Sequence, residues 1–336
     1  MSETGIPGLS YPHAPPAGTA PPSTTFGQIL DRVLRLMRTN WRLFVGIGLA
    51  PAAAILAYYG ILIAALFPIL KPLLLHQTGK PDFSVTSIVC LMVAYLGGMV
   101  LMILMYALYE PAAVYAALEL NNGRPVTFGK AWGVAWSNAG RYVWLAILRA
   151  LIVMLPLAIF GGLIVGSAGL SMARGRGGMD PTMMAVILPL FMLLYIAWMV
   201  YTVLIMLRLV LAVPACVAED VSAWRALRRS NQLTVGVKGR IFLLGLLIYA
   251  IAYAAFLVAE VVIFFIGAIV ALVGMMMHLA MAPWGYVGVG VGALVFACAY
   301  LLWIAAAAGA FSTMFAAVYD DQRTRLEGLG AFQSRS

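Results

Sequence analysis

TFGQILDRVLRLMRTNWRLF, residues 25–44, is a basic amphipathic segment that leads directly into a long apolar run. Similar entries follow at Thr127-Phe128-Gly129 and, in a looser form, at Ser222-Ala223-Trp224. Each apolar run has about twice the length that crosses a bilayer, so each predicts a hairpin of two transmembrane helices. A pattern that recurs about every hundred residues indicates one supersecondary unit that was copied and then diverged.

Each apolar run ends in a segment rich in Ala and Val. These exits are Pro111-Ala112-Ala113-Val114-Tyr115, Pro214-Ala215-Cys216-Val217 and Phe315-Ala316-Ala317-Val318-Tyr319. We therefore predict an all-α polytopic membrane protein with six transmembrane helices in three repeats, each an interfacial amphipathic helix plus a transmembrane hairpin. The expected repeats cover about 25–120, 127–220 and 222–321, within a membrane domain of residues 24–321. A disordered Pro-rich cytoplasmic tail is expected at 1–23, and a cytoplasmic C-terminal tail at 322–336.

The composition also indicates a membrane protein. Hydrophobic residues make up 64% of the chain and charged residues 10%, and the mean hydropathy is +0.99. Soluble domains have about 45–50% apolar and about 25% charged residues. The net charge of +9 does not indicate nucleic-acid binding, because the Lys and Arg residues flank apolar spans. The three cysteines and three histidines are scattered, so we expect no metal and no cofactor.

The entry segments are predicted to lie in the membrane interface. Thr25 and Gln28 have the spacing of a capping box, and beyond them apolar residues fill one helical face and basic residues the other. A helix of this kind lies along a lipid surface. The candidate lipid-facing cations are Arg32, Arg35, Arg38 and Arg42 in the first entry, and Arg225, Arg228 and Arg229 in the third.

The expected spans follow from the apolar runs. They cover about 44–70, 85–109 with a kinked extension past Pro111 to Leu120, 142–170 and 184–213, with a fifth from Ile241 and a sixth from Tyr286. Asn121-Asn122-Gly123 is predicted to stop the second. Apolar residues continue from 241 to 277, which exceeds one crossing, so tilt, a kink or an outer re-entrant piece is expected there.

The distribution of basic residues predicts the orientation. Fifteen Lys and Arg residues lie on the side of the entries and termini, and four lie in the opposite loops, namely Lys71, Lys80, Arg174 and Arg176. By the positive-inside rule both termini are expected to be cytoplasmic, in a bacterial-type inner membrane.

The stretch from Glu219 to Ser230, EDVSAWRALRRS, followed by Gly239-Arg240-Ile241-Phe242, resembles the membrane domain of the glycerophosphoryl diester phosphodiesterase family. Gly123-Arg124-Pro125 and the closing Val318-Tyr319-Asp320-Asp321 also resemble its pattern, and the similarity covers nearly everything after residue 24. The resemblance implies that the phosphodiesterase chemistry belongs to a separate soluble barrel. The segments outside the spans are too short for a barrel of about 250 residues, so we expect no enzyme.

Four ionisable residues inside the spans are the candidate site: Glu110, Arg149, Arg208 and Glu260. Such a group costs about 2.5–3.5 kcal/mol at the bilayer centre on insertion scales, so its position is informative. Glu110, Arg149 and Arg208 are expected at similar depth in the inner leaflet. Either Glu110 pairs with one arginine while the other snorkels, or the two arginines bind a lipid phosphate or line a cavity. Glu260 could bond a neighbouring span, sit at an interface, or serve proton coupling.

These features predict a non-catalytic integral membrane protein that scaffolds the membrane or interacts with lipid on the cytoplasmic leaflet. Its expected partners are phospholipids, a second copy or another membrane protein, and not nucleic acid. The alternative is a small transporter or permease with a cavity near Glu110, Arg149 and Arg208. A membrane-embedded lipid enzyme is the weakest alternative, because the sequence contains no convergent acid, base and nucleophile.

Overall fold

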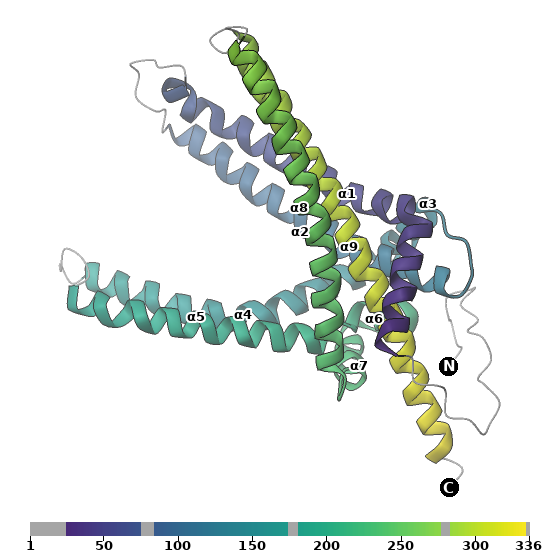
Figure 1. The fold of residues 1–336 in the computed structure, drawn as a ribbon. Coiled ribbons are helices and arrows are strands. Elements are labelled where there is room, and N and C mark those ends of the chain that lie inside the picture. The colour runs from purple at the N-terminus through teal and green to yellow at the C-terminus, as the bar shows by residue number, and fades with distance from the viewer. Residues whose placement is uncertain (1–24, 75–83, 174–180, 277–282, 334–336) are drawn as a thin grey trace.

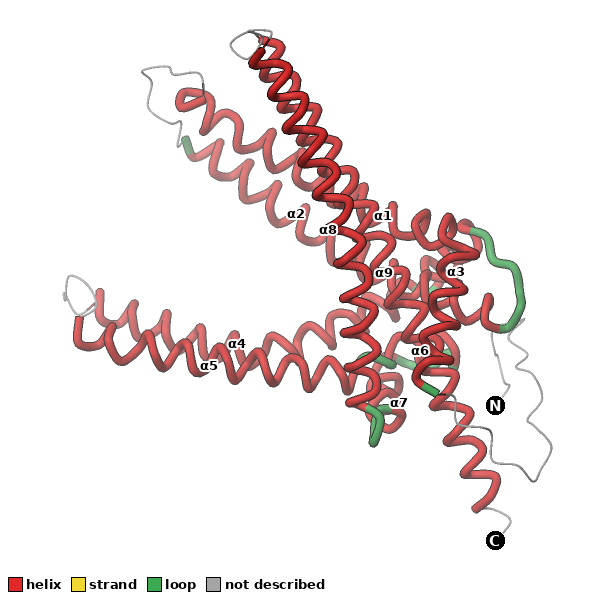
Figure 2. The backbone as a smooth tube through the Cα atoms, viewed as in Figure 1, coloured by secondary structure: helices red, strands yellow, loops and turns green. Residues whose placement is uncertain are grey.

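The computed structural model describes residues 25–74, 84–173, 181–276 and 283–333, which are helical almost throughout and contain no strand (Figure 2). Six of the helices are long and apolar enough to cross a membrane, which indicates a multi-pass membrane protein. The helices are α1 (Phe26–Leu74), α2 (Val85–Asn121), α3 (Phe128–Ser137), α4 (Ala139–Ala173), α5 (Pro181–Leu209), α6 (Ala212–Ala218), α7 (Ala223–Leu233), α8 (Lys238–Met276) and α9 (Pro283–Gln333).

The long helices pair as three hairpins, α1/α2, α4/α5 and α8/α9, which diverge from a common base (Figure 1). The short helices α3, α6 and α7 lie in that base. The first and last hairpins touch along α1 and α9, while the α4/α5 hairpin extends away from both. The described chain is therefore compact at one end and spread at the other.

Two glycines allow α1 and α9 to approach closely. A Cβ added to Gly48 of α1 would lie 2.6 Å from Cβ of Ala305, and one added to Gly309 of α9 would lie 2.9 Å from Cβ of Phe44. Small residues at helix interfaces allow backbones inside a membrane to approach in this way. The junction of the first and last hairpins therefore depends on residues without side chains.

The chain bends where each of the first two entries meets its span. Inside α1, Asn40 has φ −121° and ψ 28°, and Asn138, between α3 and α4, has φ −116° and ψ 23°. The predicted capping box at the start of α1 is confirmed: Thr25 N donates to Gln28 Oε1 at 2.8 Å, and Gln28 N donates to Thr25 Oγ1 at 3.4 Å. The helices of these two entries therefore turn away from the spans that follow them, at Asn40 and at Asn138.

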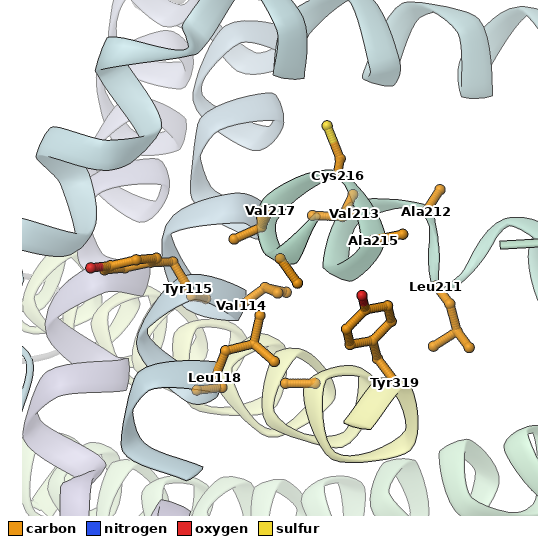
Figure 3. Close-up of a cluster of buried hydrophobic side chains, with 14 of the residues drawn as sticks. Val114, Tyr115, Leu118, Leu211, Ala212, Val213, Ala215, Cys216, Val217 and Tyr319 are labelled. Atoms are coloured by element: carbon orange, nitrogen blue, oxygen red, sulfur yellow. The ribbon is translucent and has the colours of Figure 1, made fainter. Parts of the chain in front are cut away.

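The exits of the three hairpins form the centre of the hydrophobic core of the base, and apolar residues of the entries, such as Val33, Ala131 and Leu227, join them. Residues 107–119 of α2 and residues 209–218, which include α6, are buried without interruption, and residues 316–319 of α9 join them. Figure 3 shows α6 lying over α2 and α9, with the ring of Tyr319 directed toward α6. Ala112, Ala113 and Ala116 are fully buried, and their small side chains let the exit helices pack closely.

The helix of the fourth predicted span is interrupted near its end. We expected it to reach residue 213, but α5 ends at Leu209, and the chain turns before α6 begins at Ala212. In a continuous helix the ring of Pro214 would clash with the carbonyl of Val210 and leave it without a donor. Breaking the helix places Pro214 in the first turn of α6, where no internal N–H donor is needed.

The remaining boundaries largely follow the prediction. Helix α2 continues through Pro111 to Asn121, and Gly123 follows with φ +73°. Helix α8 runs as one helix for 39 residues, so no re-entrant piece lies within its bounds. Helix α9 continues to Gln333, so residues 322–333 of the predicted tail are helical. Residues 1–23 lie outside the described residues.

Hydrogen bonds near Pro156 link helices α4 and α5. Pro156 lacks an N–H, so the carbonyl of Ile152, four residues earlier, has no helical donor. The Tyr201 hydroxyl of α5 donates to that carbonyl at 2.9 Å, and Trp198 Nε1 donates to the neighbouring carbonyl of Val153 at 3.0 Å. Side chains of α5 therefore satisfy the backbone that the proline of α4 leaves open.

Candidate functional site

A buried ion pair joins the first two hairpins. Arg149 Nη1 of α4 lies 2.8 Å from Glu110 Oε2 of α2, and the two side chains are 13% and 9% exposed. Of the two sequence-based alternatives, pairing of Glu110 with one arginine is the arrangement that the structure contains. Glu110 is buried because it lies beside Pro111 in the exit of α2, where residues 107–119 are buried without interruption.

The pair lines a cavity of about 550 Å³ between the three hairpins. Its wall is contributed by α2, α4, α5, α8 and α9, and most of its side chains are apolar. The lining includes Val203, Met206, Phe242, Leu246 and Tyr249, each of which is 40–53% exposed. The cavity is therefore partly open to the surroundings of the protein.

Hydroxyl groups lie in the same wall. Tyr109 and Ser312 are 4% and 3% exposed, and both line the cavity. The Thr202 hydroxyl of α5 is buried and has no hydrogen-bond partner among the residues that the structure describes. The cavity thus combines a largely apolar surface with a few buried polar groups, which is the usual composition of a small-molecule site.

Arg208 and Glu260 lie elsewhere. The side chain of Arg208 is exposed and does not line the cavity, while its backbone carbonyl accepts a 2.7 Å hydrogen bond from Ser230 Oγ. Glu260 is half-buried in α8 and also lies outside the cavity lining. The structure therefore brings together two of the four candidate residues.

The basic entry residues lie mostly on the surface. Arg32, Arg38, Arg42, Arg225 and Arg228 are exposed, and Arg229 is half-buried. Arg35 is exposed and paired with Asp31 at 2.7 Å. Arg32 and Arg35 also line a second cavity, of about 500 Å³, between α1 and the end of α2 at Leu120 and Asn121.

Acidic residues that follow the exits tie the base together, and sequence reasoning missed this role. Glu219 Oε1 lies 3.0 Å from Arg229 Nε, and Asp220 pairs with Arg141 at the start of α4. Asp321 of α9 lies 3.3 Å from Arg240 of α8. The sequence contained a signal for these ion pairs, because acidic residues stand at the end of each exit and basic residues stand at the starts of the third and fifth spans.

The described residues contain no group of three His, Cys, Asp or Glu side chains that could hold a metal ion. Comparison of the chain with models of protein families, with curated proteins and with solved structures gave no match.

Proposed function

We propose that this chain is a non-catalytic integral membrane protein that holds membrane lipid in the cavity between its hairpins. The observation that carries the proposal is the position of the Glu110–Arg149 pair, buried at the wall of a partly open and mostly apolar cavity. Apolar lining residues suit acyl chains, and the buried polar groups suit a headgroup. The exposed arginines of the entries would contact lipid on the cytoplasmic leaflet.

The proposed architecture is the one expected from the sequence: three diverged repeats whose amphipathic entries lie on the cytoplasmic leaflet, with both termini on that side. The similar bends at Asn40 and Asn138 support the repeat. The sequence resemblance to the membrane domain of the phosphodiesterase family supports a membrane module.

A transporter or permease is the second candidate, and the cavity itself favours it. Glu110 and Arg149 line a cavity between hairpins, as the alternative requires, although Arg208 does not. Flux of a solute across proteoliposomes, abolished by filling the cavity, would support transport over lipid holding.

The lipid proposal is tested by filling the cavity. Gly245 of α8 lines it, and a Cβ at this position would lie 3.9 Å from Met314 and Phe311, so Gly245→Leu projects into the space without a backbone clash. Gly267→Leu is the matched control, because Gly267 lies on the same helix with nothing within 4 Å of its Cβ. Native mass spectrometry after detergent extraction should show less bound phospholipid in Gly245→Leu alone. Equal retention by both variants would contradict the proposal.

A further inference from the structure

The polar wall of the cavity has no net charge when Glu110 and Arg149 are both ionised. The two groups are buried and joined at 2.8 Å. Removing one partner of such a pair leaves an uncompensated charge at low dielectric, which is strongly unfavourable. An anion that captured Arg149 would leave Glu110 in this state, and a cation that captured Glu110 would do the same to Arg149. A ligand that carries one charge of each sign avoids both penalties.

The pair also has hydrogen-bonding capacity to spare. The two side chains are joined by one hydrogen bond, which Nη1 of Arg149 donates to Oε2 of Glu110. A guanidinium has five N–H donors, and a carboxylate accepts about four hydrogen bonds. Since both side chains line the cavity, the remaining donors and acceptors can serve a ligand there. The buried Thr202 hydroxyl, which has no partner in the described part of the chain, adds one more group.

From this geometry we infer that the cavity binds a zwitterionic phospholipid whose head carries a phosphate and a primary ammonium. The inference rests on the lipid-holding function proposed above. Arg149 receives the phosphate, because guanidinium N–H groups match phosphate oxygens. Glu110 receives the ammonium, which offers three N–H donors, whereas a trimethylammonium head offers none. The acyl chains lie against the apolar wall formed by residues such as Phe242 and Leu246.

Competition among headgroups tests the inference on the unaltered protein. The purified protein is exchanged into equal amounts of phosphatidylethanolamine, phosphatidylcholine and phosphatidylglycerol, and the bound lipid is read by native mass spectrometry. We expect phosphatidylethanolamine to exceed each of the others by roughly threefold or more, which is a modest difference in binding free energy. Equal retention of the three heads, or an excess of phosphatidylglycerol, overturns the inference.

A charge variant sharpens the test. Glu110→Gln leaves Arg149 as a single positive charge, so the ratio of phosphatidylglycerol to phosphatidylethanolamine should rise roughly tenfold. Arg208→Gln, which changes an exposed arginine outside the cavity, is the control and should leave the ratio unchanged. If Glu110→Gln does not fold, Glu110→Arg combined with Arg149→Glu restores a neutral pair and should keep the phosphatidylethanolamine excess. A folded Glu110→Gln protein with the original ratio contradicts the inference.

The cavity-filling variant separates this inference from the proposed function. If Gly245→Leu loses lipid but the unaltered protein shows no preference among heads, lipid holding stands and the headgroup assignment is wrong. If Gly245→Leu retains as much lipid as Gly267→Leu, the cavity does not hold lipid and both proposals are wrong.

Discussion

The hydroxyl of Tyr319 donates a 2.8 Å hydrogen bond to Oε1 of Glu219, a residue one hundred positions earlier in the chain. The same carboxylate oxygen lies 3.0 Å from Nε of Arg229. One acidic side chain at the end of α6 therefore connects the exit of the last hairpin with α7. Figure 3 shows Tyr319 reaching from α9 toward α6.

Replacing Tyr319 by Phe should lower stability. Tyr319 is fully buried, and a hydrogen bond to a charged group contributes about 1.5–3 kcal/mol. We expect a clear loss in thermal stability in detergent, measured as the melting temperature. Tyr300→Phe, at a 43% exposed position on the same helix, is the control and should change little. Equal effects of the two substitutions would contradict the importance of the Glu219 contact.

Replacing Tyr201 by Phe should weaken the α4/α5 hairpin, because the carbonyl of Ile152 loses the hydroxyl that bonds it in place of the N–H that Pro156 lacks. The expected cost is about 1 kcal/mol. In a Pro156→Ala background the new backbone N–H can bond that carbonyl, so the same change should cost less. A double-mutant cycle on thermal stability measures this coupling. Identical costs in the two backgrounds would show that Pro156 and Tyr201 are independent.

Gly48→Ala and Gly60→Ala should have opposite effects although both lie in α1. Alanine is favoured over glycine in a helix by about 1 kcal/mol, so Gly60, which has nothing within 4 Å of its Cβ, should tolerate or gain from the change. At Gly48 the methyl group would meet Ala305, and overpacking costs about 1–3 kcal/mol. The melting temperature should therefore fall in Gly48→Ala and stay the same or rise in Gly60→Ala. A neutral Gly48→Ala would contradict the close approach of α1 and α9.

Replacing one partner of the Glu110–Arg149 pair should lower the stability of the protein more than replacing both. Arg149→Leu leaves a buried carboxylate without a partner, and such changes cost about 3–5 kcal/mol. Adding Glu110→Leu should recover much of the loss, because the double variant buries no charge. Arg208→Leu is the comparison, and it should have little effect since Arg208 is exposed. Additive losses from Glu110 and Arg149 would exclude a coupled pair.

The proposed orientation is checked by reporter fusions. The fifteen-to-four distribution of basic residues predicts that fusions at Ser336 and after Leu120 report the cytoplasm and that one near Gly177 reports the outside. An external C-terminus would contradict the proposed topology.

The sequence predicted the helical hairpins well because long apolar runs and their polar breaks are local signals. It also predicted the end of α2, since Asn122 and Gly123 stop a helix through their own backbone preferences. The free-energy cost of burying an unpaired carboxylate was enough to predict that Glu110 pairs with an arginine. The sequence could not predict which arginine forms the pair, because that depends on how two hairpins pack.

Tertiary features were harder to foresee. Nothing local distinguishes Gly48 from Gly60, and only the approach of α9 gives the first its role. The break before α6 could have been read from Pro214, but Pro111 stands in a similar exit and its helix continues. The cavity is lined by residues of all three hairpins, so no single segment of the sequence could predict it.

The core at the base has a consequence for biosynthesis. It includes the exits of all three hairpins, and the members that α9 contributes, Met314 and residues 316–319, are translated after the first two hairpins. The first two hairpins therefore enter the bilayer before their shared core can close. Until Tyr319 is translated, α6 and the exit of α2 present uncovered apolar surfaces, which insertion factors or proteases can recognise as a core that has not yet closed.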